Sequence, residues 1–270
     1  MSKKRILHQI AAVLIICLFA AGTVMMLPAG QIKAEAAAAN GLVKKSGKLY
    51  FYKNGKPIIN HWKTVNRKTY YFGENGAAVR GWKVLKKGKK YQLFWFSSKK
   101  VLDKNKTKGV PQKCVHAIAV KSDKLLKKWG ITKETAKEEA IEIIFSHLSN
   151  SQEYIYARDT GSKSRYWSYR YAKQMLAKKA GSCYHYASAF GFLVKRAIGI
   201  PVRICRGKAK VFSDKWQPHA WAEIKLKGVW YIYDPNAKAY SKLTNINFAG
   251  LKVSASKKWY KAENKEIIYM

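Results

Sequence analysis

The chain has 270 residues, of which 53 are lysine or arginine and 15 are aspartate or glutamate, giving a formal net charge of +38. Positive charges at this density repel one another in a folded protein unless anions are near. The charge therefore implies a polyanionic partner and excludes a protein that functions without one. Nucleic acid is an alternative partner, since basic and aromatic residues are interleaved throughout, but no zinc motif or groove-binding helix supports it. Anionic wall polymers or an acidic surface are therefore favoured. The length is enough for one catalytic domain and a small module.

Residues 1–36 have the features of a secretory signal peptide. Basic residues at positions 3–5 precede an apolar run over residues 10–26, and residues 34–36 (AEA) form a small-residue cleavage site. The alternative is an uncleaved anchor, because the apolar run approaches membrane-spanning length. The helix-breaking residues 28–30 (PAG) favour cleavage, after which no transmembrane anchor is expected.

Residues 40–102 repeat a pattern with a period of about 20 residues. An aromatic stretch followed by Asn-Gly occurs at residues 49–55 and again at 69–76, and a degenerate third copy spans residues 88–96. Aromatic strands separated by glycine turns predict successive β-hairpins that stack, since one hairpin cannot bury its own face.

These hairpins resemble the cell-wall-binding repeats of Gram-positive surface proteins, in which aromatic side chains of adjacent hairpins cage a choline group. The resemblance makes Trp62, Tyr71 and Trp82 candidate ligand-binding residues. Leu49 and Thr69 stand where the second cage tryptophan usually lies, so attachment to wall polymers or glycans is expected in place of choline binding. The alternative is that these aromatic residues only hold the hairpins together.

Residues 103–115 are polar and show no apolar period, which predicts a linker before a catalytic domain at 116–270. The first element of that domain is predicted to be a helix over residues 133–149. Thr135 and Glu138 form a capping-box pattern at its start, and an apolar stripe follows.

A buried helix is predicted to begin at Cys183, because residues 184–197 carry apolar side chains at helical spacing and end at a Gly and Pro stop signal. Free N–H groups and the positive dipole end of a first helical turn favour a thiolate and can receive an oxyanion. Ser182 is a candidate N-cap, and Gly181 would let the backbone turn sharply into the helix. The alternative is a buried, inert cysteine.

Residues 219–226 and 229–234 flank Lys227-Gly228 and predict a tight β-hairpin. Its register makes His219 and Asp234 diagonal neighbours on one face, about 7–8 Å apart at the backbone. A thiol, an imidazole and a carboxylate then provide a nucleophile, a base and an orienting group. The alternatives are a half-buried structural histidine and an aspartate that only forms a turn.

Four motifs within residues 181–236, in the order GSCYHYA, VKRAIGIPVR, PHAWAEI and GVWYIYDPN, resemble the transglutaminase-like superfamily. That superfamily includes transglutaminases, related cysteine proteases and peptide amidases. The resemblance maps the nucleophile to Cys183, the base to His219 and the orienting acid to Asp234. It implies acyl transfer from a protein or peptide amide, or its hydrolysis, through a cysteine thioester.

The expected fold class is α+β, because helices come first, among them a basic, aromatic helix near 165–178, and antiparallel strands follow. The resemblance implies a papain-like or transglutaminase-like core, with helices packed on an antiparallel sheet, behind an N-terminal β-hairpin repeat module. In this family an upstream aromatic side chain often assists the oxyanion. Trp167 and Tyr166 are the nearest candidates, with simple packing as the alternative.

Three cysteines follow the expected cleavage site. If Cys183 is the nucleophile, Cys114 and Cys205 are left as a possible disulfide in an extracellular protein, and two free thiols are the alternative. No Cys or His pair has metal-ligand spacing apart from Cys183 and His185, so no metal and no cofactor is expected.

These features predict a secreted, cell-wall-associated cysteine enzyme. Its expected partners are a protein or peptide substrate and anionic wall polymers or glycan, with no specific nucleic acid. The principal alternative is a non-catalytic surface protein that uses the same scaffold for binding.

Overall fold

The structure is a computed structural model that describes residues 40–159, 161 and 164–270. The expected signal peptide and its cleavage site lie outside the described residues. The described chain divides into two compact units, a smaller one of residues 40–60 with Glu74–Ala77 and a larger one of His61–Gly73 with Ala78–Met270. Within the described ranges, no helix combines the length and the apolar character needed to cross a membrane.

The smaller unit is a three-stranded antiparallel sheet. Its strands are β1 (Gly41–Lys45), β2 (Lys48–Lys53) and β3 (Lys56–Pro57). Asn54 and Gly55 both have positive φ in the turn between β2 and β3, which is the conformation that a tight hairpin turn requires. The first predicted hairpin repeat is therefore present.

The larger unit begins with two further hairpins. They are formed by β4 (His61–Val65) with β5 (Lys68–Phe72), and by β6 (Gly81–Lys87) with β7 (Lys90–Phe96). Phe72 and Phe96 are fully buried at the ends of β5 and β7. These hairpins confirm the predicted N-terminal hairpin structure.

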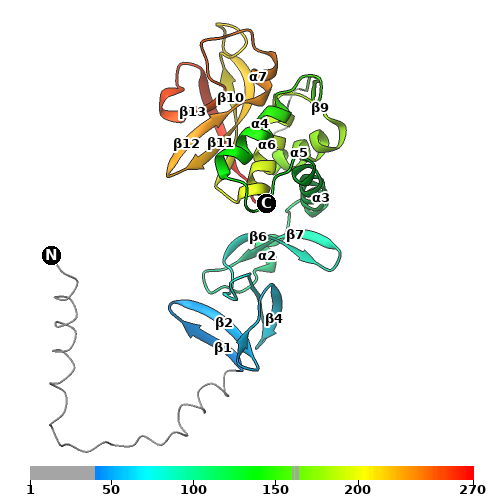
Figure 1. The fold of residues 1–270 in the computed structure, drawn as a ribbon, viewed down its shortest axis with the longest axis vertical. Helices are drawn as coiled ribbons and strands as arrows, with labels where there is room; N and C mark the ends of the chain where they lie inside the picture. The colour runs from blue at the N-terminus through cyan, green and yellow to red at the C-terminus, as the bar shows by residue number, and fades with distance from the viewer. Residues whose placement is uncertain (1–39, 160, 162–163) are drawn as a thin grey trace, which may run out of the picture. The chain divides into compact units, whose positions relative to one another are not determined.

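The rest of the larger unit is a five-stranded antiparallel sheet packed against helices (Figure 1). The sheet order is β13-β12-β11-β10-β14, with β10 (Val202–Ala209), β11 (Gln217–Leu226), β12 (Val229–Tyr233), β13 (Ala249–Lys252) and β14 (Tyr260–Ile267). The main helices are α3 (Gln112–Lys128), α4 (Lys137–Leu148), α5 (Trp167–Lys178) and α6 (Cys183–Ile198). The short elements are α2 (Lys104–Thr107), β8 (Ile155–Tyr156), β9 (Ala180–Gly181), α7 (Pro235–Tyr240) and a 3-10 turn at Val253–Ala255. The expected α+β class is confirmed.

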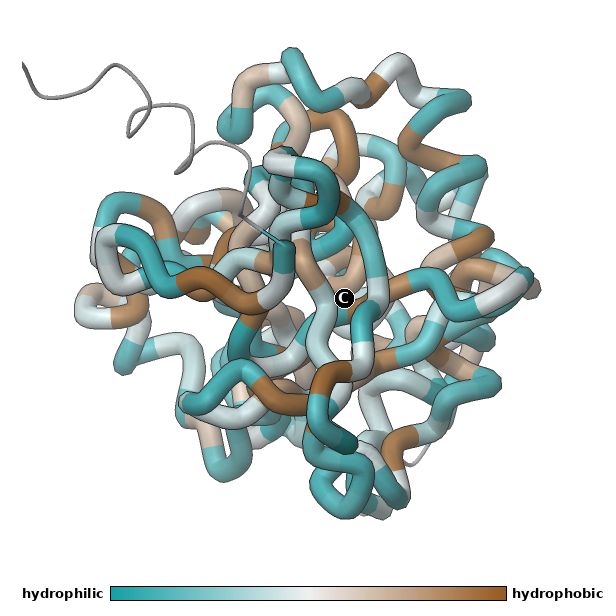
Figure 2. Tube along the Cα trace, turned by 90° about the horizontal axis from the view of Figure 1, so that it is seen from below, coloured by the Kyte–Doolittle hydropathy of each residue, from teal (hydrophilic) through white to brown (hydrophobic). Residues whose placement is uncertain are grey.

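Helix α6 is the centre of this fold. It packs on β10 and β11 and is surrounded by α3, α4 and α5. A helix that is apolar on nearly all sides belongs in a core, and α6 has buried residues on consecutive positions from 185 to 194. Figure 2 shows short apolar segments separated by hydrophilic ones along the trace, in agreement with the charge of the chain.

The segment 103–115 differs from the expected linker. Helix α2 and the first turn of α3 lie within it, and Val115 is fully buried. The prediction missed α3 altogether, although its buried positions recur at helical spacing. The polar residues between them, and the Gly and Pro just before the helix, obscured this pattern.

The predicted helix 133–149 is real but begins at Lys137. Thr135 does not cap it, because its hydroxyl accepts a hydrogen bond from the Thr132 N–H at 2.9 Å in the preceding turn. The capping-box prediction was therefore wrong. The predicted apolar stripe is buried and consists of Ile141, Ile144, Phe145 and Leu148.

Candidate active site

Cys183 is the first residue of α6, as predicted, and Ser182 is the N-cap. The backbone N–H of Ser182 donates to His185 Nδ1 at 3.1 Å, and His185 Nε2 faces Gln174 Oε1 at 3.1 Å. Burial lowers the pKa of His185 to about 4, so this histidine is neutral and holds the start of the helix.

Gly181 has a different role from the predicted sharp turn. It has no positive φ, but a Cβ at this position would lie 2.3 Å from the ring carbon Cγ of His185. Only glycine leaves room for the imidazole, so Gly181 allows the His185 ring to lie close to the backbone of residue 181.

His219 and Asp234 meet as the hairpin register predicts. Leu226 pairs with Val229 and Ala222 with Tyr233, which brings the residue after β12 to the face of β11 that carries His219. His219 Nε2 lies 2.7 Å from Asp234 Oδ2, and both side chains are buried.

Two further groups fix the carboxylate of Asp234. Its Oδ1 accepts the Ala237 N–H at 3.0 Å, which caps α7, and its Oδ2 accepts the Tyr260 hydroxyl at 2.9 Å. Burial, and next the charge of Asp234, raise the pKa of Tyr260 well above its ordinary value, so the hydroxyl stays a donor. Sequence analysis missed Tyr260, because no local pattern connects the start of β14 to Asp234.

The imidazole of His219 is held in its protonated form. Burial alone would lower its pKa, but the charge of Asp234 and then that of Cys183 raise it to about 10. Since Nε2 is engaged by Asp234, Nδ1 is the nitrogen left for the hydrogen bond with Cys183 that also raises this pKa. The three predicted residues thus form one connected group.

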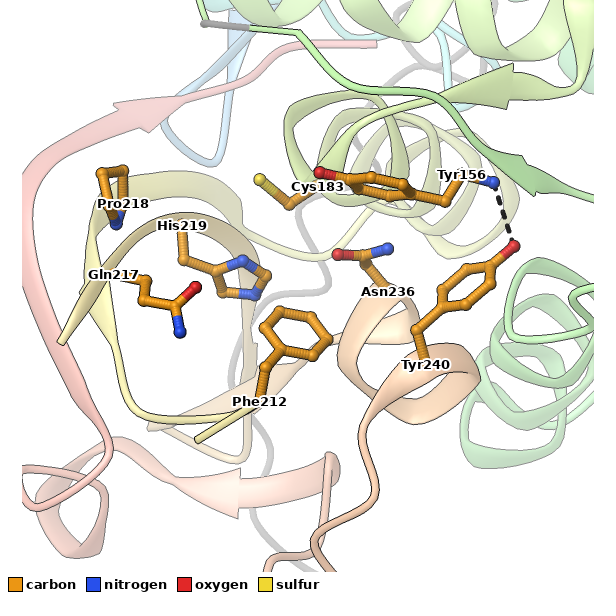
Figure 3. Close-up of a pocket in the computed structure, with 8 residues that line it drawn as sticks. All are labelled: Tyr156, Cys183, Phe212, Gln217, Pro218, His219, Asn236 and Tyr240. Carbon is orange, nitrogen blue, oxygen red and sulfur yellow. Dashed lines mark hydrogen bonds between the residues drawn. The ribbon is translucent and has the colours of Figure 1, made fainter. Parts of the chain in front are cut away.

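A pocket of about 300 Å³ opens onto this group (Figure 3). It is lined by Tyr156, Cys183, Phe212, Gln217, Pro218, His219, Asn236 and Tyr240. Among the described residues, no lysine or arginine belongs to this lining, in spite of the charge of the chain. Apart from Cys183 and His219, the lining side chains are uncharged, and three of them are aromatic (Tyr156, Phe212 and Tyr240).

The pocket wall opposite His219 comes from two tyrosines that sequence analysis missed. The Tyr156 N–H donates to the Tyr240 hydroxyl at 2.9 Å, and that hydroxyl donates to the Tyr154 carbonyl at 3.1 Å. Burial and the charge of Cys183 raise the pKa of Tyr156. The short strand β8 therefore brings a neutral phenol to the thiol.

Tyr166 and Trp167 do not reach this pocket. Trp167 is buried against the rings of Tyr171 and Tyr184, and Tyr166 lines a separate cavity with Arg206. These two residues therefore have a packing role, which was the alternative to assisting the oxyanion.

The hairpin candidates fall into two clusters. In the first, the ring of Trp62 lies 5.2 Å from that of Tyr71 and 4.9 Å from that of Phe94. The Lys87 ammonium lies 5.7 Å from the Trp62 ring centroid and 6.0 Å from that of Phe94. This cluster therefore already contacts a cation of its own chain.

Trp82 belongs to the second cluster. Its ring lies 5.3 Å from that of Trp95 and 5.6 Å from that of Tyr269 near the end of the chain. Trp82 thus packs the third hairpin against the rest of the larger unit, while Trp62 and Tyr71 are neighbours of each other.

All three described cysteines are free, so the possible disulfide between Cys114 and Cys205 is not formed. Cys205 is buried in β10, and burial and next Glu223 raise its pKa well above the ordinary value. In the described part of the chain, no group of three or more His, Cys, Asp or Glu residues is arranged to hold a metal ion.

Residues 126–235 match the model of the Transglutaminase-like superfamily. This segment, which contains Cys183, His219 and Asp234, is a transglutaminase-like domain. A search of curated proteins found no match.

Solved structures similar to parts of the chain include a multimodular pneumococcal cell wall endolysin from phage Cp-1 complexed with choline. It shares 25% identity over 24% of this chain and 18% of its own, with a TM-score of 0.21. A putative cysteine protease from Cytophaga hutchinsonii shares 20% identity over 54% of this chain and 50% of its own, with a TM-score of 0.33. Legionella pneumophila LapG shares 20% identity over 59% of this chain and 81% of its own, with a TM-score of 0.35.

Proposed function

We propose that the protein is a cysteine enzyme that forms a thioester with the acyl group of a protein or peptide amide. The observation that carries this proposal is the connected group of Cys183, His219 and Asp234 at the pocket. An inert cysteine has no need of a buried, protonated imidazole beside it, nor of a carboxylate fixed by three donors.

The reaction follows from the positions of these groups. The Cys183 thiolate attacks the amide carbonyl carbon, and the backbone N–H groups at the start of α6 receive the oxyanion. His219 gives its proton to the amide nitrogen, the C–N bond breaks and an amine or ammonia leaves, so that a thioester remains. Water or an amine then attacks the thioester, His219 takes a proton from it, and the thiolate is regenerated.

Asp234 and Tyr260 act through the imidazole. The carboxylate accepts a hydrogen bond from the Nε2–H and keeps Nδ1 directed at the thiol, which is the role of an orienting group. Tyr260 in turn restricts the carboxylate.

The test is to incubate the full-length protein with a glutamine-containing peptide and a labelled primary amine, and to follow amine incorporation, deamidation and peptide cleavage by mass spectrometry. Any of these products should form with the wild type. Cys183→Ser and iodoacetamide treatment should each abolish it, and His219→Ala should slow it by about 10²–10⁴-fold. Activity that is unchanged in Cys183→Ser would refute the thioester mechanism, and a wild type that forms none of these products would favour the non-catalytic surface protein.

We further propose that the enzyme is secreted and acts at the cell wall of a Gram-positive organism. Support comes from the apolar N-terminal segment, the net charge of +38 and the aromatic hairpins. The purified protein should bind isolated wall material, and binding should weaken as salt is raised because counterions screen the contacts. Binding that does not change with salt would contradict an electrostatic attachment.

A further inference from the structure

Asn236 is a buried amide whose hydrogen-bonding groups are both unused. Its side chain is 1% exposed, and neither Nδ2 nor Oδ1 has a hydrogen-bond partner among the described residues. An unpaired buried polar group costs about 1–3 kcal/mol. Native proteins keep few such groups, and each of them calls for an explanation.

The position of Asn236 is tightly fixed. It follows Asp234 and Pro235, and Pro235 begins α7 with a backbone angle that suits a first helical turn. Asp234 caps the same turn while it holds His219. The fold that orients the imidazole therefore also sets the Asn236 side chain in the pocket.

Asn236 lines the same pocket as Cys183 and His219. Figure 3 shows its carboxamide among the rings of His219, Tyr156 and Tyr240. A group that occupies this pocket beside the thiol therefore also lies beside Asn236.

A carboxamide presents one donor and one acceptor side by side. The group that satisfies both presents an acceptor and a donor side by side, as an amide does. A carboxylate or an ester would leave Oδ1 without a donor, and an amine would leave Nδ2 without an acceptor. Apart from Cys183 and His219, which carry the reaction, the lining has no charged side chain that would select a different ligand.

We infer that Asn236 is a substrate-binding residue that pairs with an amide group of the acyl donor. Its Nδ2 donates to the carbonyl oxygen of that group, and its Oδ1 accepts from the N–H. This inference rests on the proposed function of the Cys183 site, and it adds to the site a residue that selects amides.

The test uses two thiol reagents on the full-length protein, so that it needs no known substrate. Iodoacetamide carries an amide that can pair with Asn236, whereas methyl methanethiosulfonate carries none. The rate of modification of Cys183 is followed by mass spectrometry of its peptide. Asn236→Ala, and Asn236→Leu, which keeps more of the volume, should slow iodoacetamide by about three- to tenfold, the worth of one net hydrogen bond. Both should leave the methanethiosulfonate rate unchanged.

Asn245→Ala, at an exposed position outside the pocket lining, is the matched control and should change neither rate. Because Asn236→Ala removes unpaired atoms, its melting temperature should equal or exceed that of the wild type.

Equal rates with both reagents in Asn236→Ala and wild type would overturn the inference while leaving the proposed function intact. Equal slowing with both reagents, or a clear fall in melting temperature, would overturn it as well, because Asn236 would then act on the thiol or on the fold. A wild-type Cys183 that reacts with neither reagent would instead count against the proposed function.

Discussion

At the scale of single residues, three cysteines of one chain lie in three different environments. Cys183 starts a helix and lines a pocket, Cys205 is buried in a strand beside Glu223, and Cys114 is half-buried in α3. Since the thiolate is the reactive form of cysteine, environment decides reactivity. The structure therefore predicts a reactive Cys183 and an unreactive Cys205 within one protein.

We expect Cys183 to be alkylated by iodoacetamide at neutral pH more than about tenfold faster than Cys205. Burial and Glu223 raise the pKa of Cys205 and keep it a thiol, whereas Cys183 faces the His219 imidazole. Peptide mass spectrometry measures both rates in one sample. His219→Ala should slow the reaction of Cys183 but not that of Cys205. Equal rates for the two cysteines in the wild type would contradict the prediction.

The raised pKa of His219 also predicts how stability depends on pH. A histidine whose pKa rises from about 6.5 in the unfolded chain to about 10 in the fold stabilises the fold fully below pH 6.5. That contribution is lost as the pH rises through 10. Asp234→Asn keeps a good N-cap for α7 but removes the charge, so it should lower the free energy of unfolding by about 3–5 kcal/mol at pH 6.

This difference between wild type and Asp234→Asn should shrink toward pH 10, as measured by urea unfolding at several pH values. A difference that stays constant from pH 6 to pH 10 would show that the imidazolium does not stabilise the fold.

At the scale of elements, strand β14 connects the edge of the sheet to the site. Its first residue is Tyr260, which donates to Asp234, and it pairs with β10 through a bulge at Arg206 and Gly207. A Cβ at Gly207 would lie 2.0 Å from the backbone oxygen of Lys261. The close approach of two backbones at this bulge therefore sets the position of Tyr260.

Gly207→Ala should accordingly cost about 1–3 kcal/mol of stability and lower turnover, because β14 must move and takes Tyr260 with it. Thermal unfolding and the peptide assay measure the two effects. Gly228→Asn is the control, since Gly228 has positive φ, which Asn tolerates, and no atom lies within 4 Å of a Cβ there. A Gly207→Ala variant as stable and active as the wild type would refute this role of the bulge.

At the scale of the whole molecule, the boundary between the two compact units does not lie at the polar segment 103–115, where the sequence predicted a linker. The third hairpin belongs to the larger unit, with Leu93 in its hydrophobic core and Trp82 against Tyr269. Gln112 of α3 exchanges two hydrogen bonds with the backbone of Leu93. The hairpin β6–β7 thus has a packing role beside any binding role.

Truncation distinguishes these roles. A chain that starts at His61 should keep the melting temperature of the larger unit, whereas one that starts at Asp103 should melt several degrees lower. The second chain loses the burial of Leu93 and the contact of Trp82. Burying one large apolar side chain contributes about 1.5–3 kcal/mol to stability. Each kcal/mol lost lowers the melting temperature by about 2–4 °C. Scanning calorimetry measures both chains. Equal melting temperatures would mean that the third hairpin adds nothing to the fold.

The sequence by itself determined the features whose causes are local. The stop after α6, the Ser182 cap and the turn at Lys227 and Gly228 follow from residue types at fixed spacing, and the turn sets the register that joins His219 to Asp234. The aromatic period predicted the hairpins for the same reason. The start of α4 and the helix within the expected linker were misjudged where local signals conflicted.

Only the tertiary structure decided which distant residues complete the site. Tyr260 and Tyr156 reach Asp234 and Cys183 from strands far away in the chain, and no local pattern specifies such contacts. The same holds for the unpaired state of Asn236 and for the division of the hairpin aromatics into two clusters. Burial and hydrogen-bond pairing depend on everything that surrounds a group, so they exist only once the chain has folded.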